Sequence, residues 1–177
     1  MQQQIENAII YLKQQDVDGC ITGSCLLDYF EGQDVDVFLY NEKAFTKLFY
    51  AMYHNPMFTI LDKLELWKAE MFMNKESFSN SKHVSGVQTI KFMYNTCVPI
   101  NIIFKKNCTN IFSVLSSFDI NIICKGYDLK TKEYLDLTTN PGKIASWNKW
   151  NPAFQNTEIW SVSRILRQLE RCFKYHK

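Results

Sequence analysis

Apolar residues recur at two spacings along the chain, and each spacing predicts one kind of element. Near the N-terminus they return every three or four positions, as at Ile5, Ile9 and Leu12, which predicts an amphipathic helix over residues 3–15. Further helices are expected over residues 25–30, 41–53, 111–118 and 157–175. Short apolar or alternating runs predict strands over residues 20–22, 35–40, 58–61, 67–73, 88–95, 98–106 and 119–124, the last together with the following Tyr127, and a hairpin over residues 126–137.

The order of these elements predicts an α+β fold, with a mixed β-sheet and helices packed mainly on one face. We expect a single domain over residues 1–177. Residues 1–137 would form its core, and residues 138–177 a polar, tryptophan-bearing connection and a C-terminal amphipathic helix. The hydrophobic content of 46% is sufficient for a packed core.

Charge and cysteine content narrow the function classes. Residues 1–40 hold one basic and seven acidic residues, whereas residues 143–177 hold seven basic and two acidic residues, which indicates two electrostatically distinct surfaces. The six cysteines form no Cys-x-x-Cys pair, so neither a zinc site nor a disulfide framework is expected. No apolar run is long enough to span a membrane and the first residues do not resemble a secretory signal, so we expect a cytoplasmic protein without a membrane partner.

The stretch TGSCLLDYFEGQDVDV, residues 22–37, contains the candidate chemistry. Asp34 and Asp36 occupy alternate positions at the start of a predicted strand, so their carboxylates share one face. Two like charges held together repel each other unless a cation lies between them, which predicts a site for Mg²⁺ or Mn²⁺. Gly23 lets the backbone approach a ligand closely, and the backbone N–H groups that begin at Ser24 suit a phosphate. These features together predict a site for a nucleoside triphosphate with its metal.

This spacing resembles the signature of the DNA polymerase β-like nucleotidyltransferase superfamily: an apolar residue and Gly-Ser, then Asp-x-Asp and an apolar run. The matching segments are residues 21–24 and 34–39. The resemblance implies a nucleotidyltransferase-like mixed sheet, with Ser24 on the triphosphate and Asp34 and Asp36 on two metal ions. It further implies transfer of a nucleoside monophosphate from an NTP to an acceptor hydroxyl, with release of pyrophosphate. The acceptor is left open between a nucleic-acid end, a protein hydroxyl and a small molecule.

The third carboxylate of that superfamily has no direct counterpart here. Its expected place, in the strand VPINIIF, is occupied by Asn101, whose amide ligates a metal weakly and does not accept a proton. Asp119 is the candidate catalytic substitute, and a turn aspartate bonded to backbone N–H groups is the competing interpretation. Glu70, Asp128 and Asp136 are less well supported. The alternative function is therefore a catalytically degenerate protein of the same fold that acts as a nucleotide- or protein-binding module.

A basic stripe lies on the last predicted helix, where Arg164, Arg167, Arg171 and Lys174 recur at helical spacing. Such a stripe suits a nucleic-acid backbone. We prefer the interpretation that it is the solvated face of a docking helix, because basic residues near a helix C-terminus also complement the helix dipole.

Overall fold

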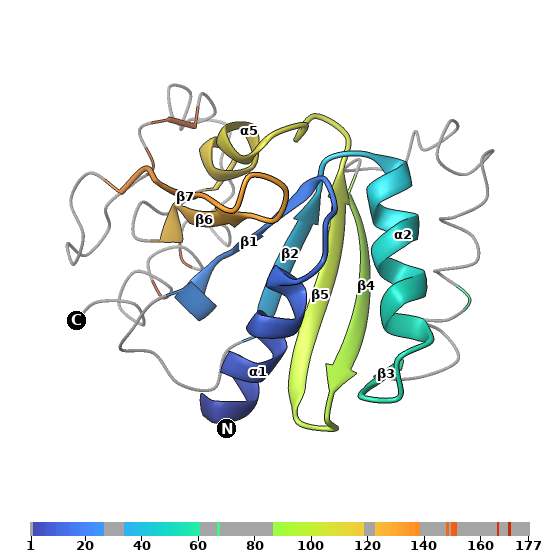
Figure 1. The fold of residues 1–177 in the computed structure, drawn as a ribbon. Coiled ribbons are helices and arrows are strands. Elements are labelled where there is room, and N and C mark those ends of the chain that lie inside the picture. Colours follow the sequence, from blue (N-terminus) through green and yellow to red (C-terminus); the bar gives the residue numbers. More distant parts are fainter. Residues whose placement is uncertain are drawn as a thin grey trace.

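The computed structural model describes residues 2–26, 34–60, 67, 87–118, 123–138, 148, 150, 151, 166 and 170. Within these residues the chain forms one seven-stranded mixed sheet, in the order β3-β4-β5-β2-β1-β6-β7 (Figure 1). Helices pack against this sheet, so the predicted α+β class is confirmed.

The elements follow one another in an order close to the predicted one. The first half comprises α1 (Gln2–Lys13), β1 (Gly19–Thr22), the 3₁₀ turn η1 (Ser24–Leu26), β2 (Val35–Leu39), α2 (Glu42–Tyr53) and β3 (Phe58–Ile60). The second half comprises β4 (Val87–Tyr94), β5 (Val98–Lys105), α5 (Ile111–Ser116), β6 (Lys125–Asp128) and β7 (Tyr134–Asp136).

Local signals in the sequence fix several of these boundaries. Asn41 caps α2, because its side chain accepts a hydrogen bond of 2.8 Å from the backbone N–H of Ala44. The tight turn between β4 and β5 lies where it was predicted, with Asn95 and Thr96 at φ of 47° and 59°. Two consecutive positive φ angles are typical of the hairpin turns whose twist matches that of the strands.

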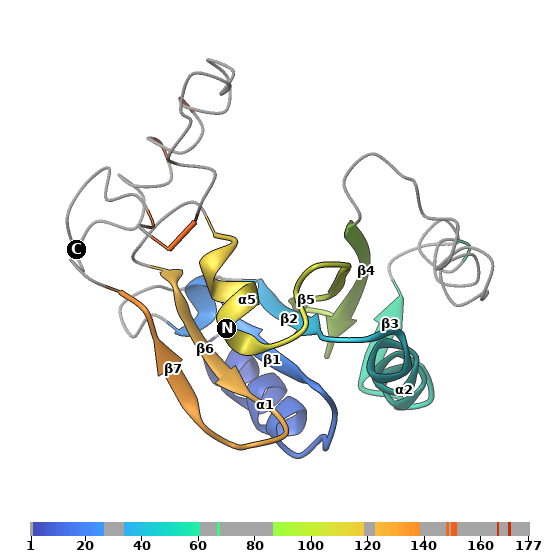
Figure 2. The same cartoon turned by 90° about the horizontal axis from the view of Figure 1, so that it is seen from above.

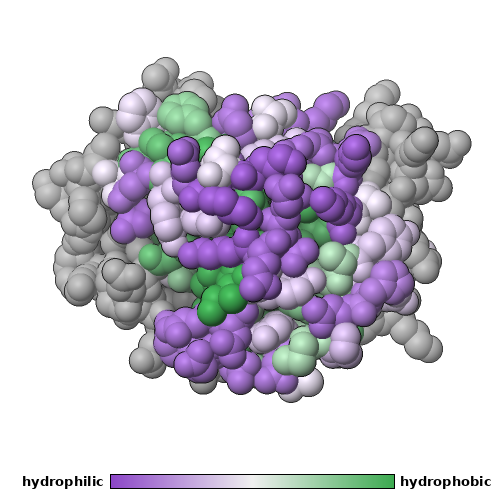
Figure 3. All heavy atoms as spheres, in the orientation of Figure 1, coloured by the Kyte–Doolittle hydropathy of each residue, from purple (hydrophilic) through white to green (hydrophobic). Residues whose placement is uncertain are grey.

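The sheet separates two apolar layers. On one face, α1 and α2 bury residues such as Leu12 and Phe45 against Val37 and Ile102 of the sheet. On the other face, α5 buries Val114 against neighbouring strands, so that among the described helices two cover one face and one covers the other (Figure 2). The face that carries α1 and α2 is mainly hydrophilic outside, because the apolar stripes of these helices point inward (Figure 3).

Strand β2 lies at the centre of the sheet and pairs differently on its two sides. It runs antiparallel to β1 and parallel to β5, whereas the other described strand pairs are all antiparallel. A parallel pair needs a crossover connection, which here includes α2. This arrangement places residues from the early and the middle parts of the sequence on adjacent strands.

Three predicted elements differ from the structure. The helix predicted from residue 25 is the 3₁₀ turn η1 as far as it is described. The strand predicted over 119–124 is wrong at Ile123 and Cys124, which are buried outside any strand, and β6 begins at Lys125. Trp67, where another strand was predicted to begin, is helical. A short buried apolar run does not reveal by periodicity alone whether it is a strand.

Some predictions concern residues that the structure describes only in part. Leu166 and Glu170 are helical, in keeping with the helix predicted over 157–175, and the residues of the basic stripe lie outside the described residues. No helix among the described residues is long and apolar enough to cross a bilayer.

Candidate functional site

Four polar side chains form a row across four adjacent strands. The strand register pairs Thr22 of β1 with Asp36 of β2, Asp36 with Asn101 of β5, and Asn101 with Lys91 of β4. Their neighbours along each strand belong to the core under α1 and α2, so these four project from the opposite face. We call Thr22, Asp36, Asn101 and Lys91 the polar row.

The Gly23 turn lies directly against this row. Gly23 has a φ of +86°, a conformation that L side chains rarely adopt. A Cβ at this position would lie 3.2 Å from the Oδ2 atom of Asp36, so a side chain would also crowd the carboxylate. The structure therefore brings the predicted phosphate-binding turn and the predicted metal-binding acid to the same place.

Both aspartates share one hydrogen-bond donor. The Asn101 amide nitrogen donates to the Oδ1 atom of Asp36 at 2.9 Å and lies 3.4 Å from the Oδ2 atom of Asp34. The Lys91 ammonium lies 4.0 Å from that same Asp34 oxygen, in a pair whose side chains are 39% and 47% exposed. An amide N–H and an ammonium thus lie beside the two carboxylates, where they offset part of the repulsion between them.

Two buried polar atoms of the row have no hydrogen-bond partner among the described residues. They are the Thr22 hydroxyl oxygen and the Asn101 amide oxygen, one on each side of Asp36. Thr22 is fully buried, and a buried polar atom without a partner costs roughly 1–3 kcal/mol. Such atoms are expected where a ligand or ion completes the arrangement.

The residue set fits a hard divalent cation with respect to ligand chemistry. Asp34, Asp36 and the Asn101 amide oxygen are the oxygen ligands that Mg²⁺ and Mn²⁺ prefer. Among the described residues, no group of three or more His, Cys, Asp or Glu side chains is placed to hold a metal. The ligands that the described residues offer to a metal here are therefore two carboxylates and an amide.

Cys25 belongs to the same turn, and the Asp36 carboxylate influences the pKa of its thiol. Burial, together with the nearby Asp36 carboxylate, raises the pKa of the Cys25 thiol to about 12. The thiol also donates to the Thr22 carbonyl at 3.2 Å. Cys25 is therefore a neutral thiol that holds the turn beside Asp36, and a role as nucleophile or metal ligand is not indicated.

The other candidate acids lie away from the polar row or outside the description. The Asp128 carboxylate closes the turn after β6, where it accepts from the backbone N–H groups of Lys130 and Thr131 and from the Tyr40 hydroxyl. Asp136 lies on the terminal strand β7, 4.0 Å from Lys125. Asp119 and Glu70 are outside the described residues.

The sequence interpretation missed two members of the polar row, Thr22 and Lys91. A signal for Lys91 was present, because it is a lone charge in the apolar run TIKFMY, just as Asn101 interrupts VPINIIF. A polar residue at one position of an otherwise buried strand requires a partner. Comparing such interruptions between strands would have pointed to the row.

Comparison with known proteins gives one result. Residues 1–150 match the model of a family described as Gabija anti-defense 2. The chain belongs to the Gabija anti-defense 2 family. No curated protein and no solved structure shows a significant match.

The Gabija anti-defense 2 match includes the whole candidate site. It extends beyond β7 and thus covers every described strand, together with the Gly23 turn, Asp34 and the polar row. The helix predicted over residues 157–175 lies beyond the match.

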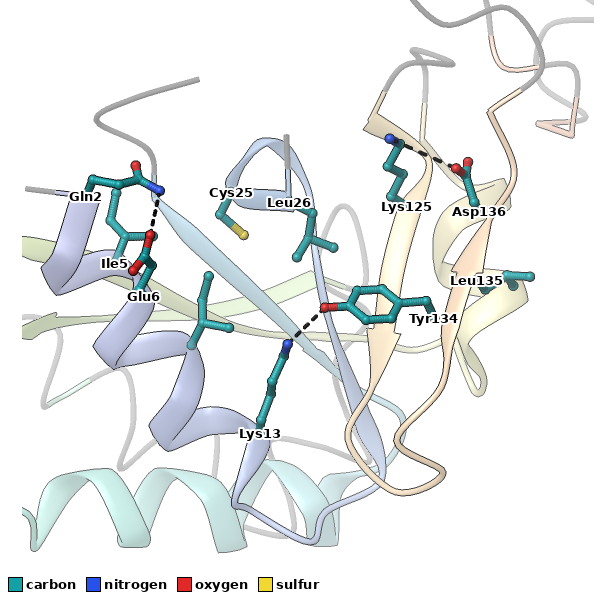
Figure 4. A pocket seen from close by; sticks show the side chains of 11 residues that line it. Gln2, Ile5, Glu6, Lys13, Cys25, Leu26, Lys125, Tyr134, Leu135 and Asp136 are labelled. Carbon is teal, nitrogen blue, oxygen red and sulfur yellow. Dashed lines mark hydrogen bonds and ion pairs between the residues drawn. The ribbon is translucent and has the colours of Figure 1, made fainter. Parts of the chain in front are cut away.

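This Gabija anti-defense 2 protein also has a pocket of about 510 Å³ on the other face of the sheet (Figure 4). Its walls are α1, the residues Cys25 and Leu26, and the β6–β7 pair. The Lys13 ammonium crosses it to donate to the Tyr134 hydroxyl at 2.9 Å and lies 4.5 Å from the centre of the Tyr127 ring. The pocket lining contains no residue of the polar row, and Cys25 of the Gly23 turn borders both the pocket and Asp36.

Proposed function

We propose that this chain is a metal-dependent nucleotidyltransferase, which moves a nucleoside monophosphate from an NTP to an acceptor hydroxyl. The family name describes proteins that act against Gabija defence. In this proposal the chain counters Gabija defence by transferring a nucleoside monophosphate to a hydroxyl group of a defence component. Its cofactor is Mg²⁺ or Mn²⁺.

The observation that carries the proposal is the meeting of the Gly23 turn with Asp36. The turn has a backbone conformation that favours glycine, and a Cβ at Gly23 would lie 3.2 Å from the Oδ2 atom of Asp36. Phosphate-binding backbone and metal-binding acids must be this close to act on one metal-bound triphosphate. The Thr22 and Asn101 oxygens on both sides of Asp36, which have no partner in the part of the chain that the structure describes, support a ligand at the same place.

The residues would divide the work as follows. The turn at Gly23 and Ser24 would orient the triphosphate. Asp34 and Asp36 would hold the divalent cation, which would neutralise charge that develops on the phosphates. The acceptor oxygen forms a bond to the α-phosphorus while the bond to the bridging oxygen breaks. Pyrophosphate leaves with the electron pair, and the proton of the acceptor hydroxyl passes to water, because Asn101 does not accept it.

The absence of a third acid at Asn101 slows this chemistry without abolishing it. A general base typically contributes about 10²–10⁴-fold to a rate. Phosphoryl transfer depends mainly on positioning and on electrostatic stabilisation, which the turn and the acid pair would still supply. A slow transferase is therefore consistent with an amide at this position.

The second candidate is a nucleotide-binding module of the same fold without turnover. The observation that favours it is the pairing of Asn101 and Lys91 with the acids, since a bridging amide and a nearby ammonium already offset the carboxylate charge. Such a site would bind a nucleoside triphosphate, and the protein would counter Gabija defence by sequestering that nucleotide.

Labelled transfer distinguishes the two candidates. The full chain is incubated with Mn²⁺ and α-³²P-labelled NTPs, together with oligonucleotides, proteins or small-molecule alcohols as acceptors. We expect a labelled acceptor and pyrophosphate with the wild type, and neither with the double variant Asp34→Asn, Asp36→Asn.

The chain provides a matched control for that variant. Asp16-Val17-Asp18 repeats the tripeptide Asp34-Val35-Asp36, but its two acids are exposed and lie apart from the Gly23 turn. The double variant Asp16→Asn, Asp18→Asn is expected to keep full transfer. Binding of the nucleotide without any labelled product would instead establish the module.

A further inference from the structure

We infer that Lys91 replaces one of the two metal ions: the site takes a single divalent cation per chain, and the Lys91 ammonium binds the triphosphate. This inference rests on the proposed function and specifies how its site would work.

The charges of the site favour one cation over two. Asp34 and Asp36 contribute two negative charges and Lys91 one positive charge, and Asn101 is neutral where a third carboxylate would add another negative charge. Two divalent ions in one site are about 3.5–4 Å apart and repel each other strongly, so they need several bridging or flanking carboxylates. Among the described residues the two carboxylates and Lys91 together carry one net negative charge, which suits one divalent ion better than two.

The position of Lys91 allows it to serve both the acid and a phosphate. It lies two strands from Asp36 in the polar row, and its ammonium is 4.0 Å from the outer acid, Asp34. Its side chain is 39% exposed, and a lysine stem is flexible, so the ammonium can move away from Asp34 when a cation arrives. An ammonium released there lies beside the metal position, across the acids from the Gly23 turn, where it would meet the part of a bound triphosphate farther from that turn.

Asn101 can make the matching exchange. Its amide nitrogen faces the acids while its buried oxygen has no partner among the described residues. Half a turn about the terminal side-chain bond exchanges the two atoms and directs the oxygen toward a cation held by Asp34 and Asp36. The N–H of Asn101 and the ammonium of Lys91 thus lie beside the carboxylates that would bind a cation.

The test counts Mn²⁺ ions and measures their affinity without any turnover. Titration of the full chain, followed by the electron paramagnetic resonance signal of free Mn²⁺, gives both quantities. We expect one Mn²⁺ per chain in the presence of a non-hydrolysable NTP analogue. In Lys91→Met, Mn²⁺ alone is expected to bind roughly three- to tenfold more tightly, because a competing positive charge is gone. The analogue is expected to bind more weakly.

Lys125→Met is the matched control, since Lys125 forms a similar pair, 4.0 Å from Asp136, with a 33% exposed side chain. It is expected to change neither affinity. Two Mn²⁺ ions per chain, or a Lys91→Met variant that behaves like the control, would overturn this inference while leaving the proposed function intact. Absence of Mn²⁺ binding that depends on Asp36 would instead overturn the proposed function, and this inference with it.

Discussion

Asp36 is surrounded by the groups that define the candidate site. The Gly23 turn lies on one side, the Asn101 amide donates to it from the other, and the Cys25 thiol lies close by. Gly23 and Cys25 belong to one turn after β1, and Asn101 belongs to β5. A change at any of them should therefore be felt at Asp36.

Replacing Asn101 by aspartate tests the proposal that this residue occupies the place of the third carboxylate of the nucleotidyltransferase superfamily. Asn101→Asp is expected to raise the rate of pyrophosphate release by about 10²–10⁴-fold, because the new carboxylate can accept the proton of the acceptor. Without metal the same variant should unfold at lower temperature, because a third negative charge replaces an amide N–H donor. Asn110→Asp is the control, since Asn110 caps α5 and aspartate caps equally well. An unchanged rate in Asn101→Asp with bound Mn²⁺ would contradict the assignment.

The buried thiols predict a loss of stability in alkali. Burial is the main cause that raises the pKa of Cys20 from 9.0 to about 12. Between these values the unfolded chain releases this proton and the folded chain keeps it, so the free energy of unfolding falls as pH rises. The expected slope is about 1.4 kcal/mol per pH unit for each such thiol.

Denaturant unfolding between pH 8 and 11 measures this slope. Cys20→Ala should reduce the slope of the unfolding free energy against pH by the contribution of one thiol. The loss of packing lowers the unfolding free energy at every pH and so leaves this slope unchanged. Cys97→Ala, at a half-buried position away from Cys20, is the comparison. Equal slopes in both variants would show that Cys20 does not keep its proton.

The same tripeptide, Asp-Val-Asp, occurs twice in the sequence, at 16–18 and at 34–36. The acids of the first copy are exposed, and those of the second share the Asn101 amide. The second copy follows Gly23 at the spacing of the nucleotidyltransferase signature, so the sequence alone identified it as the candidate site. Lys91 could be noticed as a lone charge in an apolar strand, but its place beside Asn101 depends on how β4 pairs with β5, which the pattern along one strand does not give.

At the scale of elements, alternation explains why the site can exist within a well-packed sheet. Along β2 and β5, buried apolar residues point toward α1 and α2, and the residues between them point away. One face of these two strands packs against α1 and α2, and the other carries the polar groups at Asp36 and Asn101 beside the smaller apolar layer under α5. A one-residue slip of β2 would bury both acids in the apolar layer.

Helix α1 is predicted to be one of the main supports of that layer. Leu12 is fully buried between α1 and the sheet, so Leu12→Ala should lower the free energy of unfolding by about 2–5 kcal/mol. Ile10, on the same helix but 54% exposed, is the matched control and should change it by less than about 0.5 kcal/mol when replaced by alanine. Urea unfolding of both variants measures the difference, and equal losses would contradict the packing of α1.

Elements with a clear period were predictable, and short buried runs were not. The periodic stripe of α2 and the alternation of β4 and β5 gave nearly correct boundaries. Ile123 and Cys124 read as a strand because they are apolar, yet they are buried without strand pairing. Hydrophobicity reports that a residue is buried, and only a longer periodic segment reports the conformation in which it is buried.

At the scale of the whole molecule, the strand order is what assembles the site. The α+β class followed from the order of elements, but the order β3-β4-β5-β2-β1-β6-β7 is set by pairings between distant segments. The parallel pairing of β2 with β5 places Asn101 next to Asp36 although they are 65 positions apart in the chain. A pattern read along one strand does not contain that information.

The central claim is that the Gly23 turn and the Asp34–Asp36 pair bind one metal-bound triphosphate together. The most direct measurement is a crystal structure of the full chain with Mn²⁺ and a non-hydrolysable NTP, in which anomalous scattering locates the metal. We expect an anomalous peak between the carboxylates of Asp34 and Asp36, and phosphate oxygens on the backbone N–H groups at Gly23 and Ser24. A metal or triphosphate bound elsewhere, with the polar row unliganded at saturating concentrations, would contradict the claim.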